Sequence, residues 1–134
     1  LDRYPTLLER RKEIIKKYDE ACDELGVIHL QHYGKDFASS GHLYLTRIPG
    51  ARDEQRREII TKLAERGVNT NVHYKPLPMM TAYKNMGWDI KNFPNAYAYY
   101  ENLITLPLHT KLSDEDVEYV TENFKAVVSA YTSK

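Results

Sequence analysis

A long amphipathic helix at the start of the chain constrains the fold more than any other sequence feature. From Tyr4 onward, apolar side chains recur at intervals of three, four and seven residues, and Gly26 follows as a C-terminal stop. The pattern therefore predicts one long helix that ends at Leu25, with a single apolar stripe. The stripe consists of Leu7, Leu8, Ile14, Ile15, Tyr18, Ala21, Cys22 and Leu25.

Arg11 lies on the same stripe, where a guanidinium must either extend outward to solvent or meet a partner charge. We expect it to extend outward, because arginine stems often cover apolar surface. The alternative is that this part of the stripe is a docking face for a component outside the chain.

The remaining chain alternates short strands and helices. Four strands are predicted at 27–30, 41–48, 68–73 and 103–106. Helices are predicted from Asp53 to Arg66, after Pro94, and from Ser113, where Asp116 three residues on completes a capping box, as far as Tyr131. Residues 76–88 are predicted to form a long aromatic loop, because Pro76 and Pro78 suit neither a strand interior nor a helix interior.

This order predicts an α+β fold, in which helices cover a small, mostly antiparallel sheet. The 134 residues, of which 42% are apolar and 28% charged, suit one domain that folds without a metal or disulfides. Equal numbers of basic and acidic residues, 19 of each, disfavour nucleic acid and anionic lipid as partners. No run is apolar enough for a membrane span, and the single cysteine suits a reducing, cytoplasmic setting.

Several kinds of catalytic site are disfavoured. His29 and His32 are three residues apart in a predicted strand, so they should point to opposite faces, and a metal site is not expected. The nucleophile elbow and the glycine-rich phosphate loops are missing. Cys22 lies on the apolar stripe and is expected to be an inert, buried thiol.

The segment 69–78 is the strongest candidate site. Alternation in the predicted strand places Asn69, Asn71 and His73 on one polar face, and Tyr74 and Lys75 follow directly. Such a set suits a hydroxyl-rich, anionic small molecule. A solvated strand face with an incidental histidine explains the same residues equally well. Tyrosines make up 11 of the 14 aromatic residues, and the cluster Tyr97, Tyr99 and Tyr100 favours an interface.

An ordered set of short motifs resembles the C-terminal part of the DegT-type sugar-nucleotide aminotransferases. The matching residues are Arg10, Arg11 and Tyr18; the run Ser39-Ser40-Gly41-His42-Leu43-Tyr44 with Arg47; Leu63 and Gly67-Val68; His73-Tyr74-x-Pro76-Leu77; Leu106-Pro107-Leu108; and Leu112-Ser113-x-Glu115-Asp116-Val117-x-x-Val120. The motifs cover nearly the whole chain.

The resemblance implies a fold-type I enzyme that uses pyridoxal 5'-phosphate (PLP) to move an amino group, commonly from glutamate, to a keto sugar linked to a nucleoside diphosphate. Such reactions make amino sugars for surface polysaccharides and similar products. The family's cofactor lysine, its pyridine-binding aspartate and most of its phosphate cup belong to a large N-terminal domain that nothing here resembles. Residues 1–134 are thus expected to be one C-terminal fragment, with 1–26 a connecting helix and 27–134 a small α+β domain.

The resemblance also assigns roles within the fragment. His73 and Tyr74 are expected to contact the substrate, with His73 orienting a hydroxyl or phosphate, and Lys75 and Asn71 are added from their position and chemistry. Catalytic, cofactor-binding and metal-binding residues are not expected in this chain, so alone it should bind no PLP and be inactive. Its expected partners are the nucleotide sugar and the missing large domain, in an enzyme that is a homodimer.

Three alternatives stay open at this point. Some family members are PLP-dependent sugar dehydratases, and the position that distinguishes them lies outside these residues. The chain could instead be a non-catalytic module that binds a sugar nucleotide or a protein partner through its tyrosines. It could also be a fragment that self-associates through an exposed face.

Overall fold

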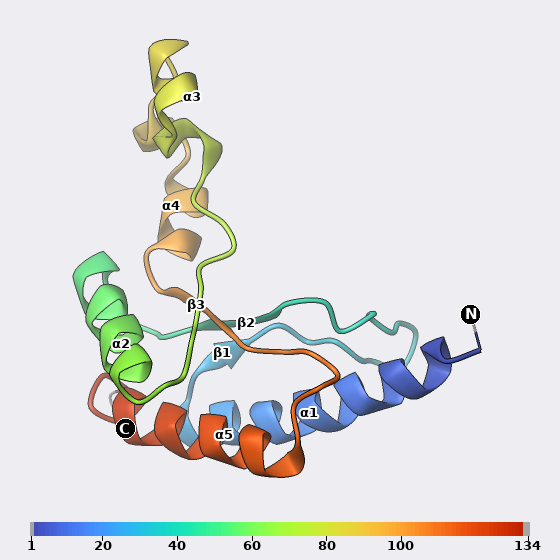
Figure 1. Ribbon diagram of the computed structural model, residues 1–134. Coiled ribbons are helices and arrows are strands. Elements are labelled where there is room, and N and C mark those ends of the chain that lie inside the picture. The colour runs from blue at the N-terminus through green and yellow to red at the C-terminus, as the bar shows by residue number, and fades with distance from the viewer. Residues whose placement is uncertain (1, 133–134) are drawn as a thin grey trace.

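The computed structural model describes residues 2–132 as five α-helices, two short 3-10 helices and three strands (Figure 1). In chain order these are α1 (Tyr4–Leu25), β1 (Ile28–His29), β2 (Tyr44–Arg47), α2 (Asp53–Glu65), η1 (Leu77–Met79), α3 (Thr81–Asn85), η2 (Ile90–Asn92), α4 (Pro94–Tyr100), β3 (Leu103–Leu106) and α5 (Asp114–Val128). The predicted α+β class is confirmed.

The three strands form one antiparallel sheet in the order β1-β2-β3. Tyr44 pairs with Leu106, and Leu45 pairs with Thr105, so successive pairs face opposite sides of the sheet. The side that carries Tyr44, Ile104 and Leu106 belongs to the core. The opposite side carries Leu45 and Thr105, and we call it the outer face.

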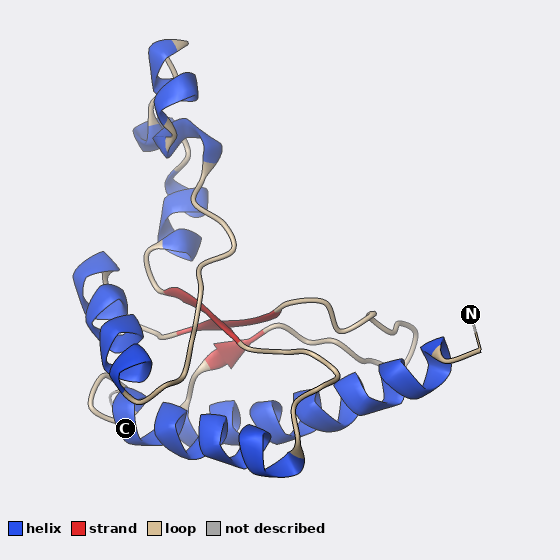
Figure 2. Ribbon diagram, viewed as in Figure 1, coloured by secondary structure: helices blue, strands red, loops and turns tan. Residues whose placement is uncertain are grey.

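Helices α1, α2 and α5 cover the core side of the sheet (Figure 2). The predicted stripe of α1 is buried at its centre, where Ile14, Ile15, Tyr18 and Cys22 are almost fully enclosed. Tyr18 packs edge-on against Tyr44, with ring centroids 5.1 Å apart, and its hydroxyl donates to the carbonyl oxygen of Pro107 at 2.8 Å. The hydroxyl of Tyr44 donates to Asp19, so both of these buried tyrosine hydroxyls have a hydrogen-bond partner.

Arg11 finds a backbone partner and does not simply extend into solvent. Its Nη1 donates to the carbonyl oxygen of Ser40 at 3.1 Å, because the segment before β2 passes directly over α1. Gly41 makes this close approach possible. It has a φ of +66°, and a Cβ at that position would lie 2.9 Å from the side chain of Ile15.

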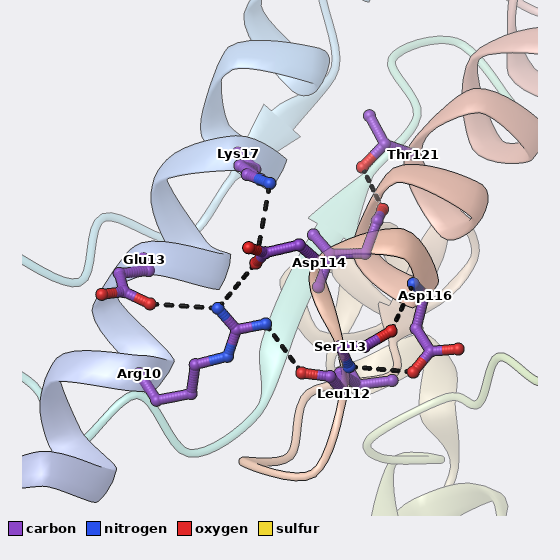
Figure 3. A network of polar contacts seen from close by, with 9 residues as sticks. Arg10, Glu13, Lys17, Leu112, Ser113, Asp114, Asp116 and Thr121 are labelled. Atoms are coloured by element: carbon purple, nitrogen blue, oxygen red, sulfur yellow. Dashed lines mark hydrogen bonds and ion pairs between the residues drawn. The ribbon is translucent and has the colours of Figure 1, made fainter.

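Arg10 ties α1 to the start of α5 (Figure 3). Its guanidinium donates to the carboxylate of Asp114 at 2.8 Å and to the carbonyl oxygen of Leu112 at 2.7 Å, and it also pairs with Glu13. The predicted capping box of α5 is confirmed, because Ser113 and Asp116 bond reciprocally. This network fixes where α5 begins relative to α1.

Residues 76–100 form an arm that stands away from the sheet (Figure 1). The sequence predicts a long, aromatic, partly ordered loop over 76–88, and the structure is more ordered than that, because η1 and α3 lie within the segment and the rings of Tyr83, Trp88 and Phe93 pack on one another. Two arginines hold the C-terminal end of α4. Arg47 donates to the carbonyl oxygen of Ala98 at 3.2 Å, and the buried Arg56 donates to that of Tyr100 at 2.6 Å. Cations at a helix C-terminus complement its dipole.

The predicted strand over 68–73 was also wrong, since the segment forms a single antiparallel bridge between Asn71 and Thr105. The Asn71 side chain accepts a hydrogen bond from the backbone N–H of Val72 at 2.7 Å, so this donor is not available to a strand ladder. Helix α2 begins at Asp53, which the sequence predicts as its N-cap, and Arg52 occupies the N-cap position, where its backbone N–H donates to the side chain of Gln55 at 3.0 Å.

His29 and His32 do not point to opposite faces. Strand β1 ends at His29, so the alternation on which that prediction depended does not continue to His32. Both rings stack on Tyr44, with centroid distances of 6.3 and 5.8 Å. Within residues 2–132, no group of three or more His, Cys, Asp or Glu side chains is placed to hold a metal ion.

Cys22 should be unreactive in the folded protein. It is fully buried, and burial raises the pKa of its thiol to about 12, so almost no thiolate forms at pH 8. We expect a thiol reagent such as Ellman's reagent to label the chain only after denaturation. Rapid labelling of one thiol in native buffer would contradict this packing of α1.

Replacing Arg10 with Met should destabilise the fold in a pH-dependent way. The Arg10 guanidinium holds the pKa of Asp114 below its usual range, so the pair stabilises the folded state above about pH 4, and this contribution is lost as the pH falls through the folded-state pKa. Urea unfolding should show the largest difference between wild type and Arg10→Met near pH 7, and a smaller one at pH 3.

A matched control for this variant is Lys12→Met on the same helix. Lys12 forms a long, exposed ion pair of 3.9 Å with Glu9, and its ammonium lies 5.8 Å from the Tyr33 ring centroid. Both contacts are weak, so replacing Lys12 should change the free energy of unfolding little. A difference between wild type and Arg10→Met that is constant from pH 7 to pH 3 would show that the Asp114 pair does not stabilise the fold.

Candidate functional site

The candidate site is built on the outer face of the sheet, where the segment before the arm meets β3. Two backbone hydrogen bonds clamp Asn71 to Thr105: the N–H of Asn71 donates at 3.1 Å, and that of Thr105 donates at 2.7 Å. Thr105 itself is held in register by its pairing with Leu45 of β2. The position of Asn71 is therefore set by the buried strand β3.

His73 is held between two polar side chains. Its Nδ1 lies 3.0 Å from the Thr105 hydroxyl, and its Nε2 lies 3.4 Å from the Asn71 amide nitrogen. The ring of Tyr74 meets the His73 ring edge-on, with centroids 4.7 Å apart. The structure thus brings together three of the four predicted site residues, Asn71, His73 and Tyr74.

Lys75 lies at the surface next to this group. Among residues 2–132 it makes no hydrogen bond or ion pair, so its ammonium group is free to meet an anionic ligand. Tyr74 is 68% exposed, and Leu77 beyond it is also exposed. The His73 imidazole thus has the exposed Tyr74 ring against it, and the exposed Lys75 follows in the chain at the base of the arm.

Sequence reasoning missed Thr105. It is buried, and its hydroxyl is the only side-chain polar group in the strand Leu103–Leu106. Alternation along that strand, with Ile104 and Leu106 facing the core, was the signal that could have placed Thr105 on the other side.

A shallow hollow lies on the same outer face, over β1 and β2. It is lined by Leu30, Leu45, Arg47 and Tyr99, among others. Arg47 is already engaged, because it bonds to Asn102 and Ala98 and lies 4.6 Å from the Tyr99 ring centroid. Arg47 therefore anchors the arm at this hollow. Tyr97 and Tyr99 are partly exposed, and Tyr100 is buried.

The described residues do not form a site that fits PLP. A PLP enzyme holds its cofactor through a lysine and anchors the pyridine nitrogen and the phosphate with further groups. None of the lysines in residues 2–132 is buried, and Lys62 and Lys125 pair at the surface with Glu58 and Glu24. The lysine that the reaction requires is not identified among these residues.

None of the helices in the described part of the chain has the length and apolar character that crossing a membrane requires.

Comparison with known proteins gives consistent matches. Residues 1–125 match the DegT/DnrJ/EryC1/StrS aminotransferase family. The spore coat polysaccharide biosynthesis protein SpsC of Bacillus subtilis (strain 168) is 31% identical over 131 residues, which are 96% of this chain and 34% of SpsC. The UDP-4-amino-4,6-dideoxy-N-acetyl-beta-L-altrosamine transaminase of Campylobacter jejuni (serotype O:2) is 28% identical over 124 residues, which are 90% of this chain and 32% of that protein.

A solved structure extends the likeness to three dimensions. Spr1654 of Streptococcus pneumoniae, described as a sugar aminotransferase, superposes in its PLP form with a TM-score of 0.93 and 53% identity, over 99% of this chain and 34% of Spr1654. The chain thus spans about a third of the length of the proteins that it matches. With a family match over residues 1–125, this chain belongs to the DegT/DnrJ/EryC1/StrS aminotransferase family.

Proposed function

We propose that this chain is the C-terminal, substrate-binding part of a PLP-dependent aminotransferase that acts on a keto sugar linked to a nucleoside diphosphate. The observation that carries the proposal is the cluster of Asn71, His73 and Tyr74 beside Thr105 of β3, in a chain whose relatives include a transaminase of a UDP-linked amino sugar. An amide, an imidazole and an exposed phenol ring together suit a sugar with several hydroxyls.

Each residue of the cluster has a distinct part in binding. His73 and Asn71 present hydrogen-bonding groups 3.4 Å apart, which is close enough to contact the same ligand group. The exposed ring of Tyr74 offers an apolar face to the sugar ring, and the ammonium group of Lys75 offers a charge to the diphosphate. Their role is to hold and orient the substrate, because general acid–base or covalent chemistry needs a group at the cofactor.

The rest of the enzyme would supply the chemistry. PLP, when bound, accepts the amino group from the donor and passes it to the keto carbon. We infer that its lysine lies in a large domain outside residues 1–134, that residues 1–26 connect to that domain, and that the enzyme is a cytoplasmic homodimer. The arrangement of the sheet supports this division, since the helices that fill the core, α1, α2 and α5, lie on the side opposite Leu45 and Thr105, and the cluster lies next to Thr105.

The direct test is an amino-transfer assay on a longer gene product that contains this chain. With PLP, glutamate and a UDP- or dTDP-linked 4-keto or 3-keto sugar, we expect an amino sugar to form, and the 134-residue chain alone should yield none. Formation of a dehydrated sugar without amine would assign the dehydratase alternative. A longer product that binds PLP but transforms none of these sugars would refute the proposal.

Replacing His73 with Ala in that longer enzyme should weaken substrate use and leave cofactor binding intact. Loss of one hydrogen bond to a sugar group should lower kcat/KM about tenfold. The absorbance of bound PLP should not change, because His73 is not a cofactor ligand in this proposal. Steady-state kinetics and an absorbance scan on the same sample measure both.

His109→Ala is the matched control, because this histidine is exposed and, within residues 2–132, makes no hydrogen bond to Asn71, His73 or Thr105. Its kcat/KM should equal that of the wild type. Equal kinetics for His73→Ala and His109→Ala would remove His73 from the substrate site.

A further inference from the structure

The orientation of the Asn71 amide is fixed by the backbone. Its Oδ1 accepts a hydrogen bond from the N–H of Val72 at 2.7 Å, and only the oxygen of an amide can accept from an N–H. The Nδ2 atom must therefore be the one that faces His73, at 3.4 Å from Nε2. Asn71 presents a donor to the imidazole ring.

This donor determines which nitrogen of the neutral His73 ring carries the proton. An Nε2–H would point at the N–H bonds of Asn71, so Nε2 must carry its lone pair. The proton then belongs to Nδ1, which donates to the Thr105 hydroxyl oxygen at 3.0 Å. Thr105 is buried and held to Asn71 by two backbone bonds, so the acceptor stays in place.

We propose that Thr105 and Asn71 are positioning residues that fix His73 as the Nδ1–H tautomer, and that the pair formed by Asn71 Nδ2 and His73 Nε2 binds one sugar hydroxyl. A hydroxyl both donates and accepts, so it can donate to Nε2 while its oxygen accepts from Nδ2. A phosphate oxygen only accepts and would meet the lone pair of Nε2. The ligand group at His73 is thus a hydroxyl and not a phosphate.

The inference about the hydroxyl rests on the proposed function, whereas the tautomer is a property of this chain alone. The contact between Asn71 and His73 is long at 3.4 Å, so an incoming hydroxyl competes with a weak hydrogen bond. Asn71 is exposed, which leaves its amide accessible to a ligand. A bound hydroxyl replaces the long contact between Asn71 and His73 with one hydrogen bond to each of them.

The tautomer can be measured on the 134-residue chain by nitrogen NMR of its histidine rings, with the His73 signals assigned from the His73→Gln variant. At pH 8 we expect the proton on Nδ1. Thr105→Val, which keeps the shape of the side chain but removes the acceptor, should shift His73 towards the Nε2–H form, and Thr105→Ser should restore Nδ1–H. An Nε2–H ring in the wild type would overturn the proposal.

Thr46→Val is the matched control. Thr46 is a buried threonine of the same sheet, but it faces the core and donates to the carbonyl oxygen of Ile104 at 2.9 Å. Loss of the Thr46 hydroxyl should affect folding about as much as loss of the Thr105 hydroxyl, and it should leave the His73 tautomer unchanged. A tautomer shift in Thr46→Val as large as in Thr105→Val would show a general loss of structure and overturn the assignment to Thr105.

The assignment of the ligand group at His73 as a sugar hydroxyl is tested in the longer enzyme. Thr105→Val should raise KM for the nucleotide-linked keto sugar about fivefold and leave the Kd of UDP or dTDP alone unchanged, and Thr105→Ser should restore KM. Equal weakening of free nucleotide and sugar substrate would overturn the hydroxyl assignment. A longer enzyme that transforms no sugar, with the Nδ1–H tautomer still present in the chain, would refute the proposed function and leave the role of Thr105 standing.

Discussion

Strand β3 is the element on which both the core and the candidate site depend. Its side chains alternate, so Ile104 and Leu106 enter the core while Thr105 faces the outer side. The same strand pairs with β2 along one edge and bridges to Asn71 along the other. A shift of one residue in its register would exchange these sides and remove both the core contacts and the acceptor for His73 at once.

The two sides of the sheet are covered by different elements. Three helices fill the core side, and the buried pair Tyr18 and Tyr44 spans from α1 to β2 there. Next to the outer face lie the segment of Asn71 and the end of α4, whose last carbonyl groups accept hydrogen bonds from Arg47 and Arg56. Thr105 is buried on this side, so its polar groups need partners: its backbone bonds to Asn71, and its hydroxyl lies 3.0 Å from Nδ1 of His73.

The sequence was informative wherever a single periodicity governed an element. The stripe of α1, the capping box at Ser113 and the apolar strand at Leu103–Leu106 were all predicted, and the structure confirms them. The strand at 68–73 was wrong because the Asn71 side chain bonds to its own neighbour, a local competition that alternation does not reveal. His73 was found from its polar neighbours, but Thr105 is distant in sequence and its role depends on tertiary pairing.

The proposed function assigns orientation of the substrate to the outer face and assigns the chemistry to another part of the enzyme. To orient a substrate, the binding groups must be held in place to well within a hydrogen-bond length. A short strand in a packed sheet supplies that rigidity. Bond making needs a cofactor lysine, and the described lysines all lie at the surface. Under the proposed function, substrate selection changes through Asn71, His73 and their support by β3 while the reacting groups stay the same, which suits a family whose members include aminotransferases named for different nucleotide sugars.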